Sequence, residues 1–333
     1  MTTQPMNAVH KADRFQRRKP VVGFPIAVIY KYFDDQGAFL AAIISFYAFI
    51  AIFPLLLIST SILGFFLQGD PELRDRLLDT ALGQFPIVGD QLGRPEGLQG
   101  SASAIIVGAL AAIYGSLNLG QAAQNAAHVT WAVPRNSRTN AVMQRLRSLA
   151  LLAFAGLGIL ATAVVSSVLA NPDAIGVDAG DLGWAIRIVG FVFTSLIFIG
   201  LFRLVSGGRA STRSVLPGAL VVSVLWQLLQ LVGNAFVTRV IAPASEMNKT
   251  FALVLGLVAF LYVAALMVVL GFEINVVLRR RLYPRALLTP FTDNVSPTEA
   301  DIKAYTGYAK SQRHKGFQSI ESTFEKRPKS PPR

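Results

Sequence analysis

Two otherwise apolar segments each carry a stripe of polar side chains. The first stripe consists of Tyr114, Asn118, Gln121, Asn125 and His128. The second stripe consists of Ser223, Gln227, Gln230 and Asn234. Spacings of i, i+4, i+7 and i+11 place each set on one face of a helix. These side chains could line a polar cavity between the two helices, or they could form the interhelical hydrogen bonds by which membrane bundles pack.

A third candidate is the stretch VVLGFEINVVLRRR at residues 268–281. Glu273 and Asn275 lie about 200° apart on a helix, so they cannot serve one site together. Glu273 precedes Arg279 by about 9 Å of helical rise, which places it near the interface that the arginines mark. We expect Glu273 to pair with Arg203, which should lie at a similar depth. The alternative is that Glu273 reaches headgroup water without a protein partner.

Patterns for catalysis, metal binding or cofactor binding are missing from the sequence. The chain has no cysteine, which excludes disulfides, thiolate metal sites and cysteine nucleophiles. No cluster of His, Asp or Glu has metal-ligand spacing, and no GxxxxGK phosphate loop occurs. The segment GSASA at residues 100–104 lacks the context of a nucleophile elbow. We therefore expect a protein that is not an enzyme and that uses no cofactor and no metal.

The composition is that of a polytopic membrane protein. Of the 333 residues, 53% are hydrophobic and only 15% are charged, against about 25% charged residues in a soluble domain. A spanning helix needs about 20 mostly apolar residues. Six segments meet this length: 38–67, 103–125, 148–170, 184–206, 215–237 and 251–278. The sequence therefore predicts an all-α membrane domain of six helices over residues 38–285, with a kink near Pro54 in the first span.

The positive charges predict which side of the membrane the termini occupy. If the N-terminus is cytoplasmic, 25 of the 31 Lys and Arg residues lie on the cytoplasmic side, as the positive-inside rule requires. Both termini are therefore expected in the cytoplasm. The net charge of +12 could instead indicate nucleic acid. No nucleic-acid-binding fold accompanies it, so we expect no nucleic-acid partner and assign the charge to cytoplasmic flanks.

Three segments lie outside the predicted spans. Residues 1–37 form a cytoplasmic N-terminus in which 20–36 are expected to make an interfacial helix. Residues 71–86, PELRDRLLDTALGQFP, have the leucine spacing of a short amphipathic helix on the extracytoplasmic surface. Residues 286–333 are polar and basic, and we expect a disordered cytoplasmic tail. Its positive charge could hold it against anionic lipid headgroups.

Four motifs together resemble the YihY/BrkB family of bacterial inner-membrane proteins, and within it the YhjD-like branch. They are FLAAIISFYAFIAIFPLLLISTSILG in the first span, YGSLNLGQAAQNAAHVTWAVPR, Pro217-Gly218 with the following Trp226, and the ending GFEINVVLRRR. The resemblance covers about residues 20–285. Where the family usually has Gly-Ala-Glu-Leu-Asn, this chain has Gly271-Phe272-Glu273-Ile274-Asn275. The resemblance implies a six-helix, multi-pass protein of the bacterial inner membrane.

The resemblance also implies a class of function without fixing it. Relatives of the YhjD-like branch have been connected with export of lipid or lipopolysaccharide, and a permease-like role has been suggested for the family. We therefore expect a transporter or permease with lipid or lipid-linked substrates and membrane lipids as partners. The alternative is a non-transporting scaffold of the cell envelope. The family has also carried a ribonuclease label, but no metal-ligand cluster of the kind used by hydrolytic nucleases supports it here. Substrate, energy source and oligomeric state are not determined by the sequence.

Overall fold

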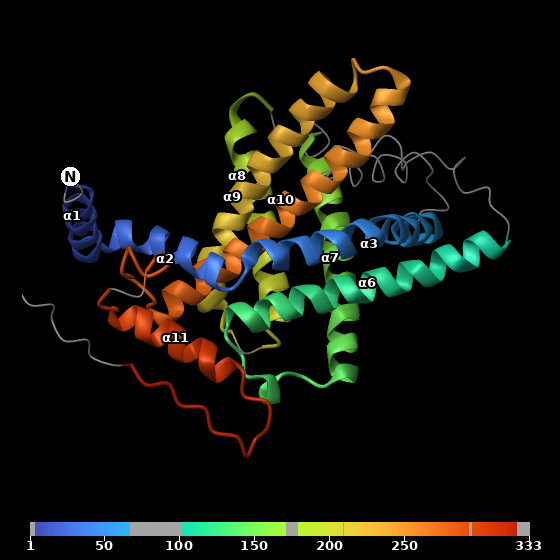
Figure 1. Ribbon diagram of the computed structural model, residues 1–333. Helices are drawn as coiled ribbons and strands as arrows, with labels where there is room; N and C mark the ends of the chain where they lie inside the picture. The colour runs from blue at the N-terminus through green and yellow to red at the C-terminus, as the bar shows by residue number, and fades with distance from the viewer. Residues whose placement is uncertain (1–3, 67–101, 171–178, 209, 293–294, 325–333) are drawn as a thin grey trace, which may run out of the picture.

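The computed structural model describes residues 4–66, 102–170, 179–208, 210–292 and 295–324, and these residues form no strand (Figure 1). The all-α fold class is therefore confirmed for this part of the chain. The amphipathic segment predicted at 71–86 lies outside the described residues. So does the side chain of Pro54, although its backbone is helical.

Nine α-helices follow one another along the described chain. They are α1 (Gln4–Arg18), α2 (Pro20–Asp34), α3 (Gly37–Phe66), α6 (Ala102–Thr130), α7 (Ala141–Ala170), α8 (Ala179–Val205), α9 (Thr212–Phe236), α10 (Glu246–Arg280) and α11 (Glu299–Ser311). A single 3-10 turn, Arg135–Ser137, lies between α6 and α7, and a π-helical turn, Val237–Ile241, continues α9.

The six predicted spans correspond to α3 and α6 to α10. By length and hydropathy, four stretches among the described residues could each cross a membrane: Ala141–Thr162, Ile188–Val205, Thr212–Ile241 and Phe251–Arg280. A fifth is obtained if α2 and the first half of α3, which meet at a 66° bend, count as one span. The described chain thus contains four to five candidate spans. Six spans and cytoplasmic termini stay predictions.

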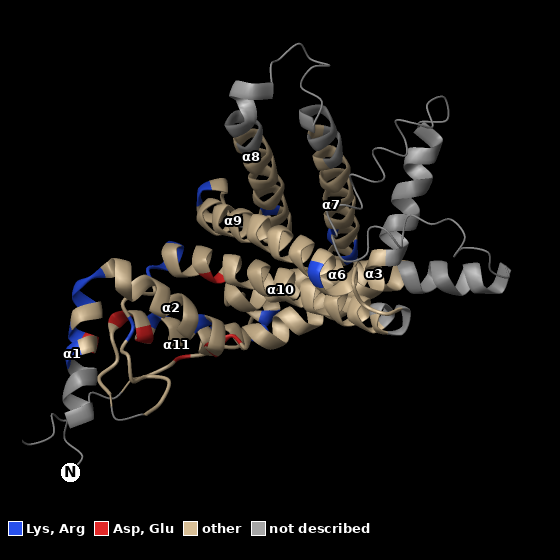
Figure 2. Cartoon of the chain, turned by 90° about the horizontal axis from the view of Figure 1, so that it is seen from above, with Lys and Arg blue, Asp and Glu red and all other residues tan. Residues whose placement is uncertain are grey.

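The long helices form a closed ring. Going round it, α3 packs against α6, α6 against α7, α7 against α8, α8 against α9, α9 against α10, and α10 against α3. Helix α10 also contacts α2 and α6, so it is the most central helix of the bundle, as Figures 1 and 2 show.

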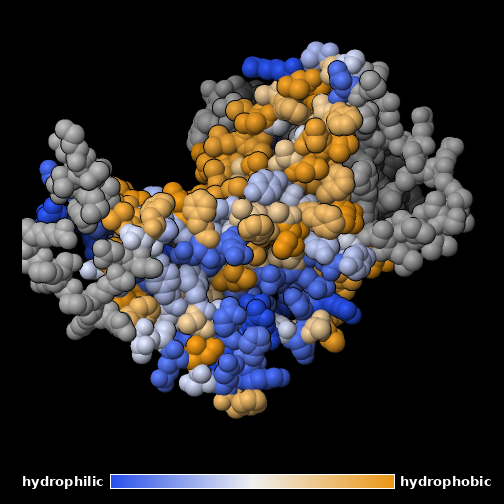
Figure 3. Space-filling view, in the orientation of Figure 1, coloured by the Kyte–Doolittle hydropathy of each residue, from blue (hydrophilic) through white to orange (hydrophobic). Residues whose placement is uncertain are grey.

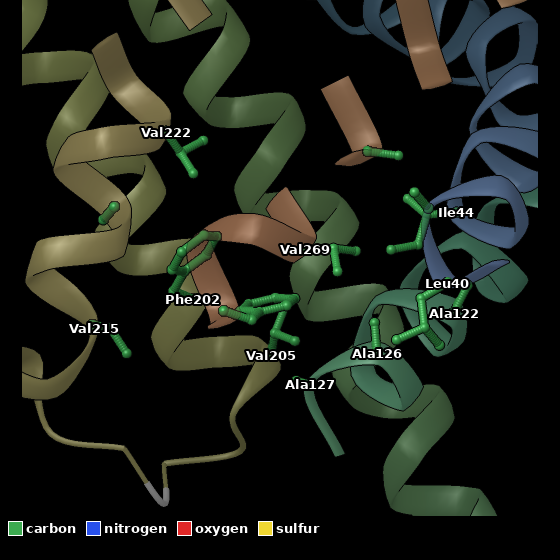
Figure 4. Packing of buried hydrophobic residues seen from close by; sticks show 14 of the residues in the cluster. Leu40, Ile44, Ala122, Ala126, Ala127, Phe202, Val205, Val215, Val222 and Val269 are labelled. Atoms are coloured by element: carbon green, nitrogen blue, oxygen red, sulfur yellow. The ribbon is translucent and has the colours of Figure 1, made fainter. Parts of the chain in front are cut away.

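The ring is filled by a hydrophobic cluster to which all six of its helices contribute. Phe202 of α8 and Val269 of α10 lie between Val222 of α9 on one side and Ile44 and Ala126 of α3 and α6 on the other (Figure 4). All five side chains are at least nine-tenths buried. Aromatic rings also join α8, α9 and α10, because the Trp226 ring makes edge contacts with Phe198 and Phe260.

Polar and apolar surfaces are separated along the bundle. Arginines occur at the end of α10, the beginning of α7 and the end of α8. These segments meet, because Arg147 of α7 lies beside Gly207 after α8, and Arg280 of α10 donates to the Trp131 carbonyl oxygen after α6. We call this end of the bundle the basic end. Figure 3 shows the same segregation, with a hydrophilic region at the bottom of the view and an apolar surface over α9 and α10. This distribution is typical of helices that cross an apolar layer and end at a charged interface.

Residues 299–311 form a helix, contrary to the disorder expected for residues 286–333. Helix α11 lies in this segment and begins with a capping box, in which Thr298 Oγ1 accepts from the Asp301 N–H and the Asp301 side chain accepts from the Thr298 N–H. The polar composition indicated disorder because the segment buries few side chains. One of these few is the charged Asp301, which is fully buried. The prediction of disorder is wrong for 299–311; residues 325–333 lie outside the described part.

Candidate functional site

A buried cluster of three charged side chains lies where α2, α3 and α10 meet. Lys31 Nζ forms an ion pair with Asp35 Oδ2, and it lies 3.2 Å from Glu273 Oε2. The three side chains are 3%, 2% and 0% exposed. Charged groups are costly to remove from water unless they are paired. We call Lys31, Asp35 and Glu273 the charged cluster.

The charged cluster is built on a sharp corner in the chain. Lys31 belongs to α2, whose last residue is Asp34, and Asp35 lies in the short break before α3 begins at Gly37. Gln36 in the break has φ of 55°, a left-handed conformation that lets the chain change direction. A Cβ at Gly37 would approach the Tyr32 ring to 2.2 Å, so only glycine fits at the start of α3. The corner holds Lys31 and Asp35 together facing α10.

Helix α11 covers the charged cluster from the basic end. The Tyr308 ring centroid is 5.5 Å from Lys31 Nζ, which is within range of a cation–π contact, and the Tyr308 hydroxyl donates to Asp34 Oδ2 at 3.4 Å. Burial raises the pKa of the Tyr308 hydroxyl above its ordinary value of 10.0, and the nearby Asp35 and Asp34 carboxylates raise it further. Tyr308 therefore remains a neutral hydrogen-bond donor above the cluster.

A second ionic group ties α11 to α2. The Arg285 side chain is 1% exposed, and it bonds Asp34 Oδ2 through Nη1 at 2.6 Å and Asp301 Oδ1 through Nε at 2.7 Å. Burial by itself would lower the pKa of the Arg285 guanidinium, but the hydrogen bonds to Asp301 and Asp34 raise it above its ordinary value. Arg285 stays charged, and it joins the ends of α2 and α11 in one network.

The N-terminal helices complete this second group. Gln16 Nε2 donates to the Arg285 carbonyl oxygen at 2.6 Å. The Leu287 N–H donates to Asp13 Oδ1 at 3.0 Å, and the Tyr30 hydroxyl donates to the Leu287 carbonyl oxygen at 2.7 Å. Residues that follow α10 are thus held by α1 and α2, which come from the opposite end of the sequence.

Glu273 does not have the partner expected from the sequence. Arg203 is exposed at the end of α8, whereas Glu273 is fully buried and faces Lys31. The expectation rested on equal depth, and depth does not fix which side of α10 faces which helix. Helix α10 turns the Glu273 face toward α2 and α3, so the pairing with Arg203 is wrong. The alternative, a Glu273 that reaches headgroup water alone, is also wrong, because the side chain is paired and enclosed.

The other residues of the Gly-x-Glu-x-Asn motif face α9 and α8. Asn275 Oδ1 accepts a hydrogen bond from the Gly218 N–H at 2.7 Å. A Cβ added at Gly271 would lie 2.6 Å from Val222 and 2.8 Å from the Phe202 ring. Within five residues, the motif therefore gives α10 a close approach at Gly271, a hydrogen bond to α9 at Asn275 and an ion pair to α2 at Glu273.

The polar stripe of α9 follows the border between its packed and exposed faces. Ser223 is fully buried, and its hydroxyl donates to the Ala219 carbonyl oxygen at 2.8 Å. Gln230 is half-buried, and Gln227 and Asn234 are exposed. Exposed amides at this depth would face lipid or another protein.

The polar stripe of α6 is mixed in the same way. Tyr114 is 65% exposed, Asn118 and Gln121 are half-buried, and His128 is buried. Asn125 is half-buried, and its Oδ1 accepts from Arg138 Nη1 at 3.2 Å. In the ring, α6 lies between α3 and α7 while α9 lies between α8 and α10, so the two stripes belong to helices that are not neighbours.

A buried amide outside both stripes makes the polar contacts between α6 and α7. Gln124 is 1% exposed. Its Nε2 lies 3.0 Å from the Gln144 carbonyl oxygen, 3.0 Å from Ser148 Oγ and 3.2 Å from the Gly120 carbonyl oxygen. The stripe spacing did not single out Gln124. The Gly120–Gln124 spacing of four residues was the signal, because it places a glycine and an amide on one close-packed face.

Three cavities stand out in the described part of the chain. An apolar groove of about 370 Å³ lies between α9 and α10 and is lined by Leu229, Val232, Gly233, Phe236, Leu255, Gly256, Ala259, Phe260 and Val263. A cavity of about 150 Å³ at the basic end is lined by His128, Trp131, Ser206 and Arg280 among others. A more open hollow of about 510 Å³ adjoins Lys310 and Arg313. Of the stripe residues, only His128 lines one of these three cavities.

Among the described residues, no group of three or more His, Cys, Asp or Glu side chains could hold a metal ion. A family model described as "Virulence factor BrkB" matches residues 28–293, which include the corner, all the ring helices and Arg285. No curated protein and no solved structure gives a significant match.

Proposed function

The chain belongs to the BrkB family and is a multi-pass membrane protein, and from this premise we propose that it is a permease-like protein that moves lipid or lipid-linked molecules. The membrane would be the bacterial inner membrane. The observation that carries the proposal is the apolar groove between α9 and α10, because its lining matches the chemistry of an acyl chain.

The groove has the composition and the place that an acyl chain requires. Every side chain that lines it is apolar, and two of the lining positions are glycines, Gly233 and Gly256. Its volume of about 370 Å³ falls in the range of ligand sites, about 300–1,000 Å³. It lies within the stretches Thr212–Ile241 and Phe251–Arg280, which are long and apolar enough to span a membrane. A chain of CH₂ groups would lose no hydrogen bond on entering the groove.

The groove lies away from the basic end. Its α9 residues belong to the last turns of α9, and its α10 residues belong to the first half of α10, whereas Arg213, Arg279 and Arg280 lie at the other end of these helices. A lipid that reaches the groove from the leaflet at the basic end must therefore pass along the bundle. Basic side chains at that end would attract anionic headgroups by about 1 kcal/mol for each Lys or Arg near the surface.

The test is lipid movement in vesicles that contain the purified full-length protein. Ala259 lines the groove and is exposed, so Ala259→Phe would fill the groove without disturbing the buried core. Ala153 on α7 is also exposed and lines none of the three cavities. Ala153→Phe is therefore the matched control. We expect the rate at which a fluorescent phospholipid changes leaflet to fall several-fold with Ala259→Phe and to stay at the wild-type rate with Ala153→Phe.

Two outcomes would contradict the proposal. Equal rates for Ala259→Phe and the wild type would remove the groove from the path. A wild-type protein that moves no lipid above the rate of empty vesicles would favour the alternative function, a scaffold of the cell envelope.

The polar stripe of α9 is a second part of the proposed path. Gln227 and Asn234 are exposed and could accept the headgroup of a passing lipid. The double variant Gln227→Leu/Asn234→Leu removes both amides from an exposed face, where folding depends on them least. A lower rate would support a headgroup path along α9, and an unchanged rate would restrict the path to the groove.

A further inference from the structure

The charged cluster has one acid too many for its base. Asp35 and Glu273 are two carboxyl groups, and among the described residues Lys31 is the one cation that contacts both. If all three were ionised, the cluster would carry a net charge of −1 with its side chains at most 3% exposed. An uncompensated buried charge of this kind is strongly unfavourable.

Other charged groups around the cluster do not supply the missing positive charge. Asp34 faces Asp35 but is itself paired with Arg285. Arg280 acts on Asp35 through space, but among the described residues it forms no ion pair with either acid. Its guanidinium is exposed and donates to the Trp131 carbonyl oxygen, so water screens its charge from the cluster. The excess negative charge of the cluster therefore remains.

The aromatic groups around the cluster are tyrosines, which carry no positive charge. Tyr32 of α2 faces Glu273 and Tyr262 of α10. Tyr308 of α11 faces Asp35 and Glu273. None of these three rings brings a positive charge, so they leave the imbalance between two acids and one base unchanged.

Glu273 lacks a hydrogen-bond donor, just as the cluster lacks a second positive charge. Within the described chain, neither carboxyl oxygen of Glu273 accepts a hydrogen bond, and Oε2 has only the ionic contact with Lys31. Oδ2 of Asp35 and Oε2 of Glu273 both contact the same Lys31 nitrogen, so the two carboxyl groups lie side by side. Two carboxylates are both acceptors, so they can bond to each other only when one of them carries a proton.

We propose that Asp35 and Glu273 share one proton next to the Lys31 ammonium, so that the charged cluster is a proton-binding site. With one proton bound, Lys31 is positive, one carboxyl is negative and the other is neutral, and the net charge of the cluster is zero. The proton supplies the hydrogen bond that Glu273 lacks.

The position of this site gives the proton a structural effect. Asp35 lies in the corner between α2 and α3, and Glu273 lies on α10. When the proton leaves, two adjacent carboxylates repel each other across the contact between the corner and α10. Loss of the proton therefore weakens that contact. The site does not depend on the lipid proposal, because proton binding can be measured without any lipid movement.

The experiment is infrared spectroscopy of the purified full-length protein in lipid nanodiscs, with Asp and Glu carboxyls labelled with ¹³C. At neutral pH the wild type should show the carbonyl band of a protonated carboxylic acid. Glu273→Gln and Asp35→Asn should each lose one carboxyl's share of this band, because the remaining acid pairs with Lys31 as a carboxylate. Both variants keep one acid and one base, so each retains a neutral ion pair. Glu299→Gln, on an exposed side chain, is the control and should leave the band unchanged.

A further variant should change the size of the protonated-acid band in the opposite direction. Lys31→Met removes the base, so both acids should be protonated and the band should grow by one carboxyl's share. A wild type without a protonated-acid band at neutral pH would overturn the proposal. A band that persists at full size in both Glu273→Gln and Asp35→Asn, or one that does not grow in Lys31→Met, would overturn it as well.

Discussion

Asn275 Oδ1 accepts a hydrogen bond from the backbone N–H of Gly218 at 2.7 Å, and this bond joins α10 directly to α9. Asn275 is 1% exposed, so water cannot replace the bond if the acceptor is removed. Proline at 217 precedes Gly218 inside α9. Proline disturbs the helical bonds around it, and the Asn275 side chain gives the Gly218 N–H a partner on the neighbouring helix.

Asn275→Leu should destabilise the folded protein. The substitution removes the acceptor but leaves the Gly218 N–H buried, which costs about 1–3 kcal/mol. A lower midpoint of thermal unfolding in detergent would be the measurement. Asn248→Leu is the control, because Asn248 lies on the same helix and is exposed. Equal midpoints for the two variants would contradict the importance of the bond.

The membrane helices and the split roles of the Gly-x-Glu-x-Asn motif could be predicted from the sequence. All six apolar segments coincide with helices of the ring. The angular separation of Glu273 and Asn275 was enough to predict that they serve different contacts, and they face α2 and α9. Both results rest on helical geometry alone, which is local and follows from the spacing of residues.

The partners of buried charges could not be predicted, because they depend on which helices become neighbours. Lys31 is 242 positions from Glu273, in a segment whose mixed composition indicated an interfacial helix. Nothing local distinguishes it from the other N-terminal lysines. The helix after α10 was easier to predict from the sequence. Thr298 and Asp301 have the spacing of a capping box, although the polar composition of the segment indicates disorder.

Gly218→Ala should be more damaging than an alanine at a glycine that faces open space. A Cβ at Gly218 would lie 2.1 Å from the Gly271 carbonyl oxygen, and that backbone cannot move without separating α9 from α10. At Gly156 on α7, a Cβ would meet nothing within 4 Å. Overpacking typically costs about 1–3 kcal/mol. We expect a lower yield of folded protein and a lower unfolding midpoint for Gly218→Ala only. A wild-type midpoint for Gly218→Ala would show that α9 and α10 can separate freely.

Arg285→Leu should release the segment that contains α11. The substitution leaves Asp301 as a buried carboxylate without its cation, a change that typically costs about 3–5 kcal/mol. Faster cleavage by trypsin at Lys303 and Lys310 is the expected result, because both sites lie on α11. The control is Glu299→Ala, which breaks only the 3.9 Å pair between Glu299 and Lys303, both exposed. If Arg285→Leu is cleaved no faster than Glu299→Ala, the Arg285 network does not hold α11.

Asp13 should make the attachment of residues 286–292 sensitive to acid. Partial burial favours the neutral acid, but hydrogen bonds from the Leu287 N–H, Arg17 and Gln16 outweigh burial and hold the pKa of Asp13 below its ordinary value of 3.8. A depressed pKa in the folded state adds stability above the unfolded pKa, and this stability is lost as the pH falls through the folded pKa. Amide hydrogen exchange of Leu287 in wild type and Asp13→Ala is the measurement. Protection should be greater in the wild type at every pH well above 3.8, and the difference should vanish at lower pH. A difference that is unchanged in acid would mean that the Asp13 carboxylate does not hold Leu287.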